Sequence, residues 1–201
     1  RELLLAKAAF DTANAQEDTP LMLAIEQGHT DVAEMLVDAS ASVDIVKRDT
    51  GATMLMTAAS AGLTEFVERL IALKASVNAT DTQKQTALHY AAAQGNRASM
   101  QVLIDAHADI DAPDCDGRTA LAVASSRGHA QALHTLLAAK AAVDVLDKQG
   151  QTALMLAANA QSAQILVDSG AELDLSDERG DTALAVAAAQ GRVSVVEVLV
   201  S

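Results

Sequence analysis

Aromatic residues are nearly absent from this chain: among 201 residues there is no Trp, one Tyr and two Phe, although half of the residues are hydrophobic. A core of this composition has to be built from Ala, Leu, Val, Ile and Met. Alanine has the highest helix propensity, and its small side chain lets the axes of neighbouring helices approach closely. The composition therefore favours thin layers of closely packed helices.

Basic residues are also scarce. Asp and Glu number 27 and Lys and Arg 14, which gives a formal net charge of -13. This charge opposes binding to nucleic acid, which depends on cations that displace counterions, and to anionic membrane surfaces. No apolar run approaches the roughly 20 residues that a membrane-spanning helix needs. We therefore expect neither nucleic acid nor a membrane as a partner.

Cysteine occurs once, at Cys115. A single cysteine excludes an internal disulfide and a metal site made of several cysteines. It suits a reducing compartment, so the expected location is intracellular, either cytoplasmic or nuclear.

Signatures of catalysis are missing as well. The sequence contains no HEXXH motif, Walker loop, dinucleotide fingerprint or EF-hand loop, and its serines lack a local nucleophile motif. We therefore predict that the chain is not an enzyme and holds no metal or cofactor.

An internal repeat is the strongest positive feature. A Thr-X-Leu signature starts at Thr19, Thr53, Thr86, Thr119, Thr152 and Thr182. Successive starts are 34, 33, 33, 33 and 30 residues apart. A fixed period of this length predicts a solenoid of stacked units.

Each unit repeats the same local signals. The threonine is placed to cap a short first helix through its side-chain oxygen, and Pro20 occupies the favoured first helical position. Nine residues after the threonine comes a glycine that can close the helix in the left-handed conformation, at Gly28, Gly62, Gly95, Gly128 and Gly191. Polar stretches at 111–117, 144–150 and 174–180 predict tight turns between units.

A second helix is predicted after each glycine from apolar residues at helical spacing. We expect these residues to form core stripes: Val32, Leu36 and Val37; Phe66, Val67, Leu70 and Ile71; Met100, Leu103 and Ile104; Leu133, Leu136 and Leu137; Val195, Val196, Leu199 and Val200.

With these signals the sequence resembles the ankyrin-repeat family, whose 33-residue unit is a β-turn plus two helices with a Thr-Pro-Leu-His-X-Ala signature. The resemblance covers essentially the whole chain. It implies an all-α solenoid of stacked helix-turn-helix units joined by β-hairpin loops, forming one domain over 1–201. Residues 1–18 are expected to end a preceding unit, because Lys7-Ala-Ala-Phe-Asp11 parallels Lys74-Ala-Ser-Val-Asn78.

Histidine and glycine mark departures from the family pattern. Only His89 fills the histidine position of the signature, so the hydrogen bonding between units that this histidine provides should be mostly absent. The glycine expected after the second helix is kept only at Gly170 and is replaced by Ser40, Lys74, His107 and Lys140. In a left-handed conformation each replacement costs on the order of 1 kcal/mol relative to glycine.

The fifth unit is short. Only 30 residues separate Thr152 from Thr182, and the usual glycine turn is missing from 157–163. We expect the loss of three residues to shorten the turn between the two helices and to weaken this layer. Hydrogen exchange should then be faster across 157–168 than across 91–104.

The resemblance implies a non-catalytic protein-protein interaction module or scaffold that binds its partner on a concave, hairpin-lined face. The alternative is a regulatory or autoinhibitory segment of a larger enzyme or channel polypeptide. The candidate partner-binding residues near the centre of that face are Lys84, Gln85, Gln94, Asp116, Arg118, Arg127, Lys148 and Gln151.

Four of these candidates are cations, which predicts an acidic or phosphorylated partner segment at the third to fifth units. Arg118 and Arg127 are the best candidates for bidentate contacts with it. The alternative interpretation is a solvated repeat surface with a chance scatter of charge.

Overall fold

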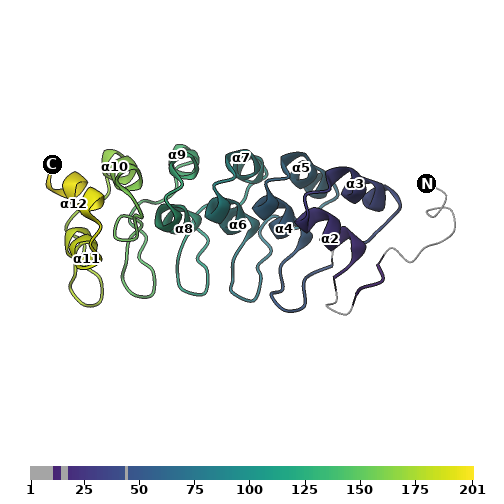
Figure 1. Ribbon diagram of the computed structural model, residues 1–201, viewed down its shortest axis with the longest axis horizontal. Coiled ribbons are helices and arrows are strands. Elements are labelled where there is room, and N and C mark those ends of the chain that lie inside the picture. Colours follow the sequence, from purple (N-terminus) through teal and green to yellow (C-terminus); the bar gives the residue numbers. More distant parts are fainter. Residues whose placement is uncertain (1–10, 15–17, 44) are drawn as a thin grey trace.

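A computed structural model describes residues 11–14, 18–43 and 45–201 as helices joined by turns and loops, arranged in two parallel layers (Figure 1). The first layer holds α2 (Pro20–Glu26), α4 (Met54–Ala61), α6 (Ala87–Gln94), α8 (Ala120–Arg127) and α11 (Ala183–Ala189). The second layer holds α3 (Thr30–Asp38), α5 (Thr64–Ala72), α7 (Arg97–Asp105), α9 (Ala130–Ala138), α10 (Ala160–Asp168) and α12 (Val193–Val200).

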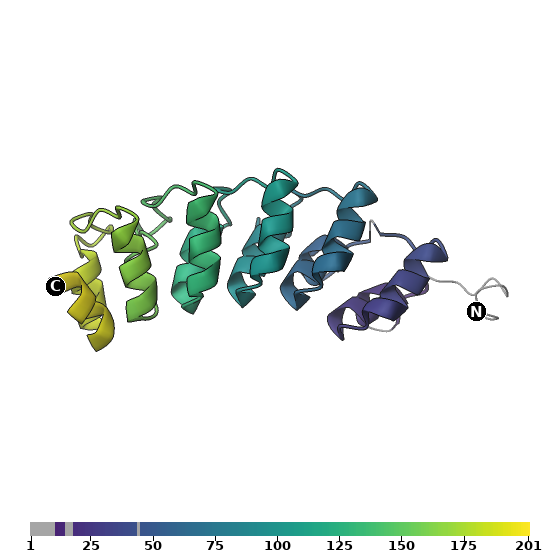
Figure 2. The same ribbon diagram turned by 90° about the horizontal axis from the view of Figure 1, so that it is seen from above.

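The helix pairs follow one another along the long axis of the molecule, as the same ribbon shows from above in Figure 2. Loops project from the first layer between successive pairs. Two of these loops contain isolated antiparallel bridges, between Val46 and Thr53 and between Ser176 and Thr182. The arrangement confirms the predicted all-α stack of helix pairs joined by hairpins.

The predicted starts of the first helices are confirmed at Thr19, Thr53, Thr86, Thr119 and Thr182 but not at Thr152, which no first helix follows. The Oγ1 atoms of four capping threonines accept a hydrogen bond from the backbone N–H three residues later, at 3.3–3.4 Å, in Thr19, Thr53, Thr119 and Thr182. Pro20 stands in the first turn of α2. These bonds satisfy backbone donors that have no partner within the helix itself.

The predicted left-handed positions are confirmed too. Ser40, Lys74, His107 and Lys140 have φ angles of 72°, 70°, 64° and 67°, although none of them is glycine. In this conformation a Cβ atom crowds the following carbonyl oxygen, at a cost of about 1 kcal/mol per residue. The chain therefore carries strain after four of its second helices.

The core lies between the two layers and between successive units. Phe66 is fully buried, and Ala58, Ala59, Ala91 and Ala92 are also shielded from solvent, which lets neighbouring first helices approach closely. Most of the predicted stripe residues contribute to this core.

Two of the predicted stripe residues are exposed. The side chains of Val32 and Val200 are 48% and 66% exposed. In α3 it is Ala33 that faces the core, and in α12 it is Val195. The prediction was wrong for these two valines, because the buried side of each helix is narrower than the run of apolar residues.

The fifth unit lacks its first helix. Residues 153–156 form a single turn, and α10 starts with Asn159 as its cap, whose side chain accepts a hydrogen bond from Ser162 N at 2.8 Å. The prediction that the deletion shortens the turn between two helices was wrong. Three residues correspond to about one helical turn. The segment that would form the first helix keeps only the turn at 153–156. The first layer is therefore interrupted between α8 and α11 (Figure 1).

An arginine from the sixth unit compensates for the missing helix. In a complete helix the carbonyl groups of Met155 and Ala157 would accept N–H groups from the next turn. Here both carbonyl groups accept hydrogen bonds from the guanidinium of Arg192, at 2.9 Å for Met155. Burial lowers the pKa of Arg192.

The fourth unit supports the same segment. Ala158 N donates to the carbonyl of Ser125 at 3.1 Å, and the Ser125 hydroxyl donates to the carbonyl of Ala153 at 2.6 Å. The shortened unit is thus fixed from both neighbours.

The expected half unit at the N-terminus lies mainly outside the described residues, as Lys7-Ala-Ala-Phe does. Asp11 is described, and its Oδ1 accepts a hydrogen bond from Ser42 N at 2.9 Å. Asn78 makes the same contact with Asp109 N at 2.8 Å. Asp11 therefore has the same role as Asn78 in joining one unit to the next.

None of the helices in the described part of the chain is long and apolar enough to span a bilayer.

Candidate functional site

A buried aspartate organises each of four hairpins. These residues are Asp81, Asp114, Asp147 and Asp177, each only 7–8% exposed. The Oδ1 atom of each accepts two backbone N–H groups of its own hairpin at 2.8–3.0 Å. Hydrogen bonds to a carboxylate favour its charged form, and the N–H groups of Asp181 and Arg179 hold the pKa of Asp177 below its ordinary value. The four hairpins thereby share one fixed shape.

Sequence analysis missed these aspartates, although a signal was present. Each stands five residues before the threonine that starts a unit. They repeat at the same intervals as the threonines themselves, so the alignment of units could have identified them.

The hairpins are also joined to one another. A backbone N–H of each hairpin donates to a carbonyl of the preceding hairpin at 2.8–3.0 Å; the pairs are Thr82 with Thr50, Cys115 with Gln83, Lys148 with Asp116, and Glu178 with Gln149. The hairpin tips therefore form a continuous row beside the first helices. We use "hairpin face" for this row together with the exposed sides of α2, α4, α6 and α8.

Close approach at the hairpin tips favours glycine. Gly117 has a φ of 83°, and a Cβ atom added to it would lie 3.1 Å from Lys148 N. Lys84 takes the equivalent position in the third unit with a φ of 57°. The lysine side chain is thus held on the hairpin face by a strained backbone.

Five of the eight predicted binding residues line one hollow on the hairpin face. This central hollow has a volume of about 300 Å³ and lies between α4, α6, α8 and the hairpin that carries Asp114, Asp116 and Arg118. The predicted residues in its lining are Gln85, Gln94, Asp116, Arg118 and Arg127. Lys84, Lys148 and Gln151 lie on hairpins outside the lining.

The two arginines of the central hollow differ in their surroundings. Arg118 Nε lies 3.5 Å from Oδ2 of the buried Asp147. The guanidinium of Arg127 is exposed and makes no ion pair with any described residue. Asp114 and Asp116 also line the hollow, so two carboxylates balance the two arginines formally. Arg127 is the cation that this part of the structure leaves available.

His89 closes the floor of the central hollow. Its Nδ1 accepts a hydrogen bond from Thr86 N at 3.2 Å, and its Nε2 donates to the carbonyl of Arg118 at 3.0 Å. Burial lowers the pKa of His89, which keeps the imidazole neutral. The bond to Arg118 confirms that this histidine joins two units, and it fixes the backbone that carries a predicted binding residue.

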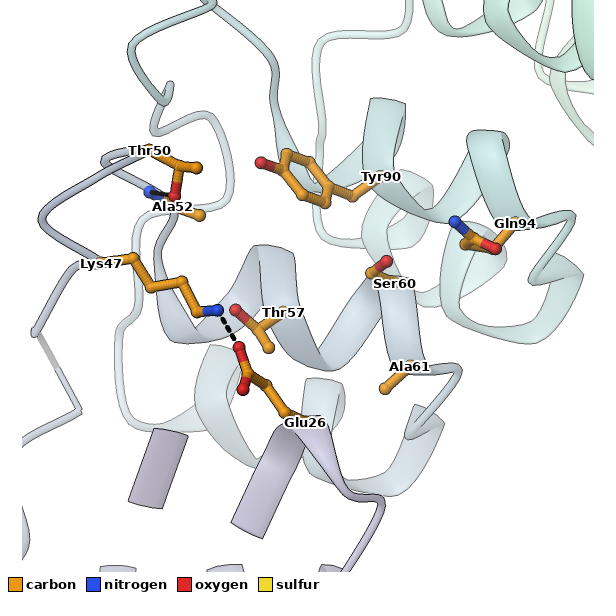
Figure 3. Close-up of a pocket in the computed structure, with 9 residues that line it drawn as sticks. All are labelled: Glu26, Lys47, Thr50, Ala52, Thr57, Ser60, Ala61, Tyr90 and Gln94. Carbon is orange, nitrogen blue, oxygen red and sulfur yellow. Dashed lines mark hydrogen bonds and ion pairs between the residues drawn. The ribbon is translucent and has the colours of Figure 1, made fainter. Parts of the chain in front are cut away.

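A second hollow lies toward the N-terminus. This N-terminal hollow has a volume of about 440 Å³ and is drawn in Figure 3. On one side Lys47 and Glu26 form an ion pair, and on the other lie Tyr90 and Gln94 of α6. Tyr90 and Gln94 also line the central hollow, so the two hollows meet at α6.

Tyr90 was not predicted as a site residue. The chain contains no other tyrosine, and this one was assigned no role from the sequence. Its hydroxyl donates to Asp81 Oδ2 at 2.9 Å. Burial and this carboxylate raise the pKa of Tyr90 well above its ordinary range.

The described residues contain no group of three or more His, Cys, Asp or Glu side chains that could hold a metal ion. The thiol of Cys115 donates to Gln83 Oε1 at 2.9 Å.

Comparison with known proteins gives three results. A family model described as "Ankyrin repeats (3 copies)" matches residues 1–81, 55–144 and 121–201. A solved structure, "Crystal structure of the ankyrin repeat domain of Bcl-3: a unique member of the IkappaB protein family", is similar with a TM-score of 0.76 and 30% identity, over 91% of this chain and 85% of that chain. A search of curated proteins found no match.

Proposed function

Because the chain belongs to the ankyrin-repeat family, whose members are protein-protein interaction modules with a non-enzymatic fold, we propose that its hairpin face binds an acidic or phosphorylated segment of a partner protein at the central hollow. The observation that carries this proposal is Arg127, an exposed guanidinium without an ion pair among the described residues, beside a second arginine in one hollow.

The carboxylates of the hollow leave this arginine available. Asp114 Oδ1 already accepts two backbone N–H groups, at 2.8 and 2.9 Å, and neither Asp114 nor Asp116 forms an ion pair with Arg127 among the described residues. Outside the lining, Asp147 Oδ2 accepts a hydrogen bond from Nε of Arg118. Among the described residues, the terminal nitrogens of both arginines have no hydrogen-bond partner, so they can form the paired, charge-assisted hydrogen bonds that carboxylates and phosphates accept.

The surrounding charge supports the same partner. Lys84 and Lys148 are exposed on the neighbouring hairpins and form no ion pair with other described residues. The whole chain has a net charge of -13, whereas two carboxylates balance the two arginines in the hollow and Lys84 and Lys148 lie on either side, so this part of the face is less acidic than the chain as a whole. Charge complementarity of this kind mainly accelerates association.

The test is a charge removal on each layer of the molecule. A partner isolated by affinity capture and identified by mass spectrometry is titrated against Arg118→Ala plus Arg127→Ala and against a control, Arg97→Ala plus Lys140→Ala. The control removes two exposed cations from the second-helix side.

We expect the first variant to slow association, to raise Kd by about tenfold or more and to weaken the salt dependence, while the control binds as the wild type does. Treatment of the partner with phosphatase separates a phosphorylated segment from a carboxylate-rich one. Unchanged binding by the first variant rejects the proposed site.

A further inference from the structure

Tyr90 has a position on the hairpin face that no other described aromatic residue shares. It stands four residues after Thr86, where the neighbouring units have Thr57 and Val123. Thr57 lines the N-terminal hollow, Val123 lines the central hollow, and Tyr90 lines both. Phe66 is fully buried, so among the described residues Tyr90 is the aromatic group that this face presents.

The tyrosine ring is held in place. Its hydroxyl is fixed by Asp81 Oδ2, while Asp81 Oδ1 accepts the N–H groups of Gln83 and Gln85 at 2.8 Å. The ring therefore projects from α6 over the N-terminal hollow with its hydroxyl end anchored in the hairpin (Figure 3). A rigid aromatic side chain offers a large contact area at a low cost in conformational entropy, and tyrosine is enriched among residues that dominate binding energy.

The remaining lining of the N-terminal hollow is neutral. The charges of Lys47 and Glu26 are matched in their own ion pair. The rest are small or uncharged residues: Thr50, Ala52, Thr57, Ser60, Ala61 and Gln94. A charged ligand group finds no unmatched partner there, whereas an apolar side chain would contact the ring and the alanine methyl groups.

We propose, on the basis of the proposed function, that Tyr90 anchors an apolar side chain of the same partner segment whose acidic group binds Arg127. Tyr90 stands four residues after its capping threonine and Arg127 eight after the next one. Neighbouring helix axes are ~8–10 Å apart and four helical residues add ~6 Å. The two contacts are then ~10–12 Å apart, which is three or four residues of extended chain at ~3.3 Å each.

The partner segment is therefore an extended peptide with an aliphatic or aromatic residue three or four positions from Asp, Glu or a phosphorylated residue. The test uses a displayed library of random 12-residue peptides selected on the whole chain. The best peptide is synthesised, and its Kd is measured by fluorescence anisotropy for Tyr90→Ala, Tyr90→Phe and Arg127→Glu. The matched control is Leu73→Ala, which removes an exposed apolar side chain beside α5.

We expect selected peptides to share this spacing, and Tyr90→Ala to raise Kd at least tenfold. Tyr90→Phe keeps the ring but loses the hydroxyl anchor to Asp81, so it should raise Kd less than Tyr90→Ala does, whereas Leu73→Ala should change Kd less than threefold. Replacing the apolar peptide residue by Ala should add no further loss in Tyr90→Ala. Circular dichroism checks that each variant keeps the helical content of the wild type.

The outcomes separate the two proposals. Peptides that lose affinity with Arg127→Glu but not with Tyr90→Ala reject the anchor and leave the proposed function standing. Peptides that are insensitive to both changes reject both. A selection that yields no peptide above background rejects the hollow as a peptide site.

Discussion

The guanidinium of Arg192 binds two carbonyl groups of the fifth unit, where the first helix is missing. Removal of this side chain should therefore destabilise the junction between the fifth and sixth units. The guanidinium donates to the carbonyls of Met155 and Ala157, residues that are 1% and 0% exposed. In Arg192→Ala these carbonyls lose their donors, while the backbone that carries them stays buried under the sixth unit.

The magnitude follows from the two hydrogen bonds. A hydrogen bond from a charged donor contributes about 1.5–3 kcal/mol, and water that enters the vacated space recovers part of that. We therefore expect Arg192→Ala to destabilise the junction by ~2–3 kcal/mol. An opening free energy lower by ~2 kcal/mol corresponds to about thirtyfold faster exchange.

Hydrogen exchange followed by mass spectrometry measures this locally. Exchange should accelerate in α10, α11 and α12, and remain unchanged in α6 and α7. The control Arg97→Ala removes an exposed arginine at the start of α7, and should change stability by no more than ~0.5 kcal/mol. Unchanged exchange in α11 and α12 of Arg192→Ala, or equal acceleration in all helices, would refute the role assigned to Arg192.

Three further predictions concern backbone strain and burial. Lys74→Gly and Lys140→Gly should each stabilise the chain by up to ~1 kcal/mol, because both lysines have positive φ angles; urea unfolding measures the gain. Gly117→Ala should cost ~1–2 kcal/mol in the same assay, since its Cβ would crowd Lys148 N. Burial lowers the pKa of His89 below its ordinary 6.5, so the stability it contributes is complete above pH 6.5 and is lost as the pH falls from there toward the lowered value; an NMR titration of its ring protons giving a pKa at or above 6.5 would contradict this.

The repeated parts of the fold could be predicted because their signals are local. A threonine that caps a helix, or a lysine forced into the left-handed region, is determined within a few residues of the chain. The period of about 33 residues then placed the hairpins and the complete helix pairs in register.

The irregular unit could not be predicted in the same way. A deletion of three residues can shorten a turn or remove helical residues, and the choice depends on what fills the space left behind. Arg192 lies 35 residues from Ala157. It follows Gly191 as Asn96 follows Gly95 and His129 follows Gly128, and those two side chains also bond to backbone carbonyls of the preceding unit, so its position predicts a contact with the fifth unit but not the missing helix. The expectation that the fifth unit exchanges faster than the third remains a prediction.

The candidate site was predicted in part for a similar reason. Alignment of the units brought Gln85, Gln94, Arg118 and Arg127 to one place because their positions repeat. The contribution of Tyr90 depends on its anchoring by Asp81, a contact that is visible only once the hairpin is folded against α6.

The binding face is the central claim, and an NMR map of the labelled chain with a selected peptide tests it most directly. The account predicts that amide shifts cluster at 57–61, 85–94 and 116–127, on the hairpin face. A cluster in α7 and α9, on the second-helix layer, would contradict it.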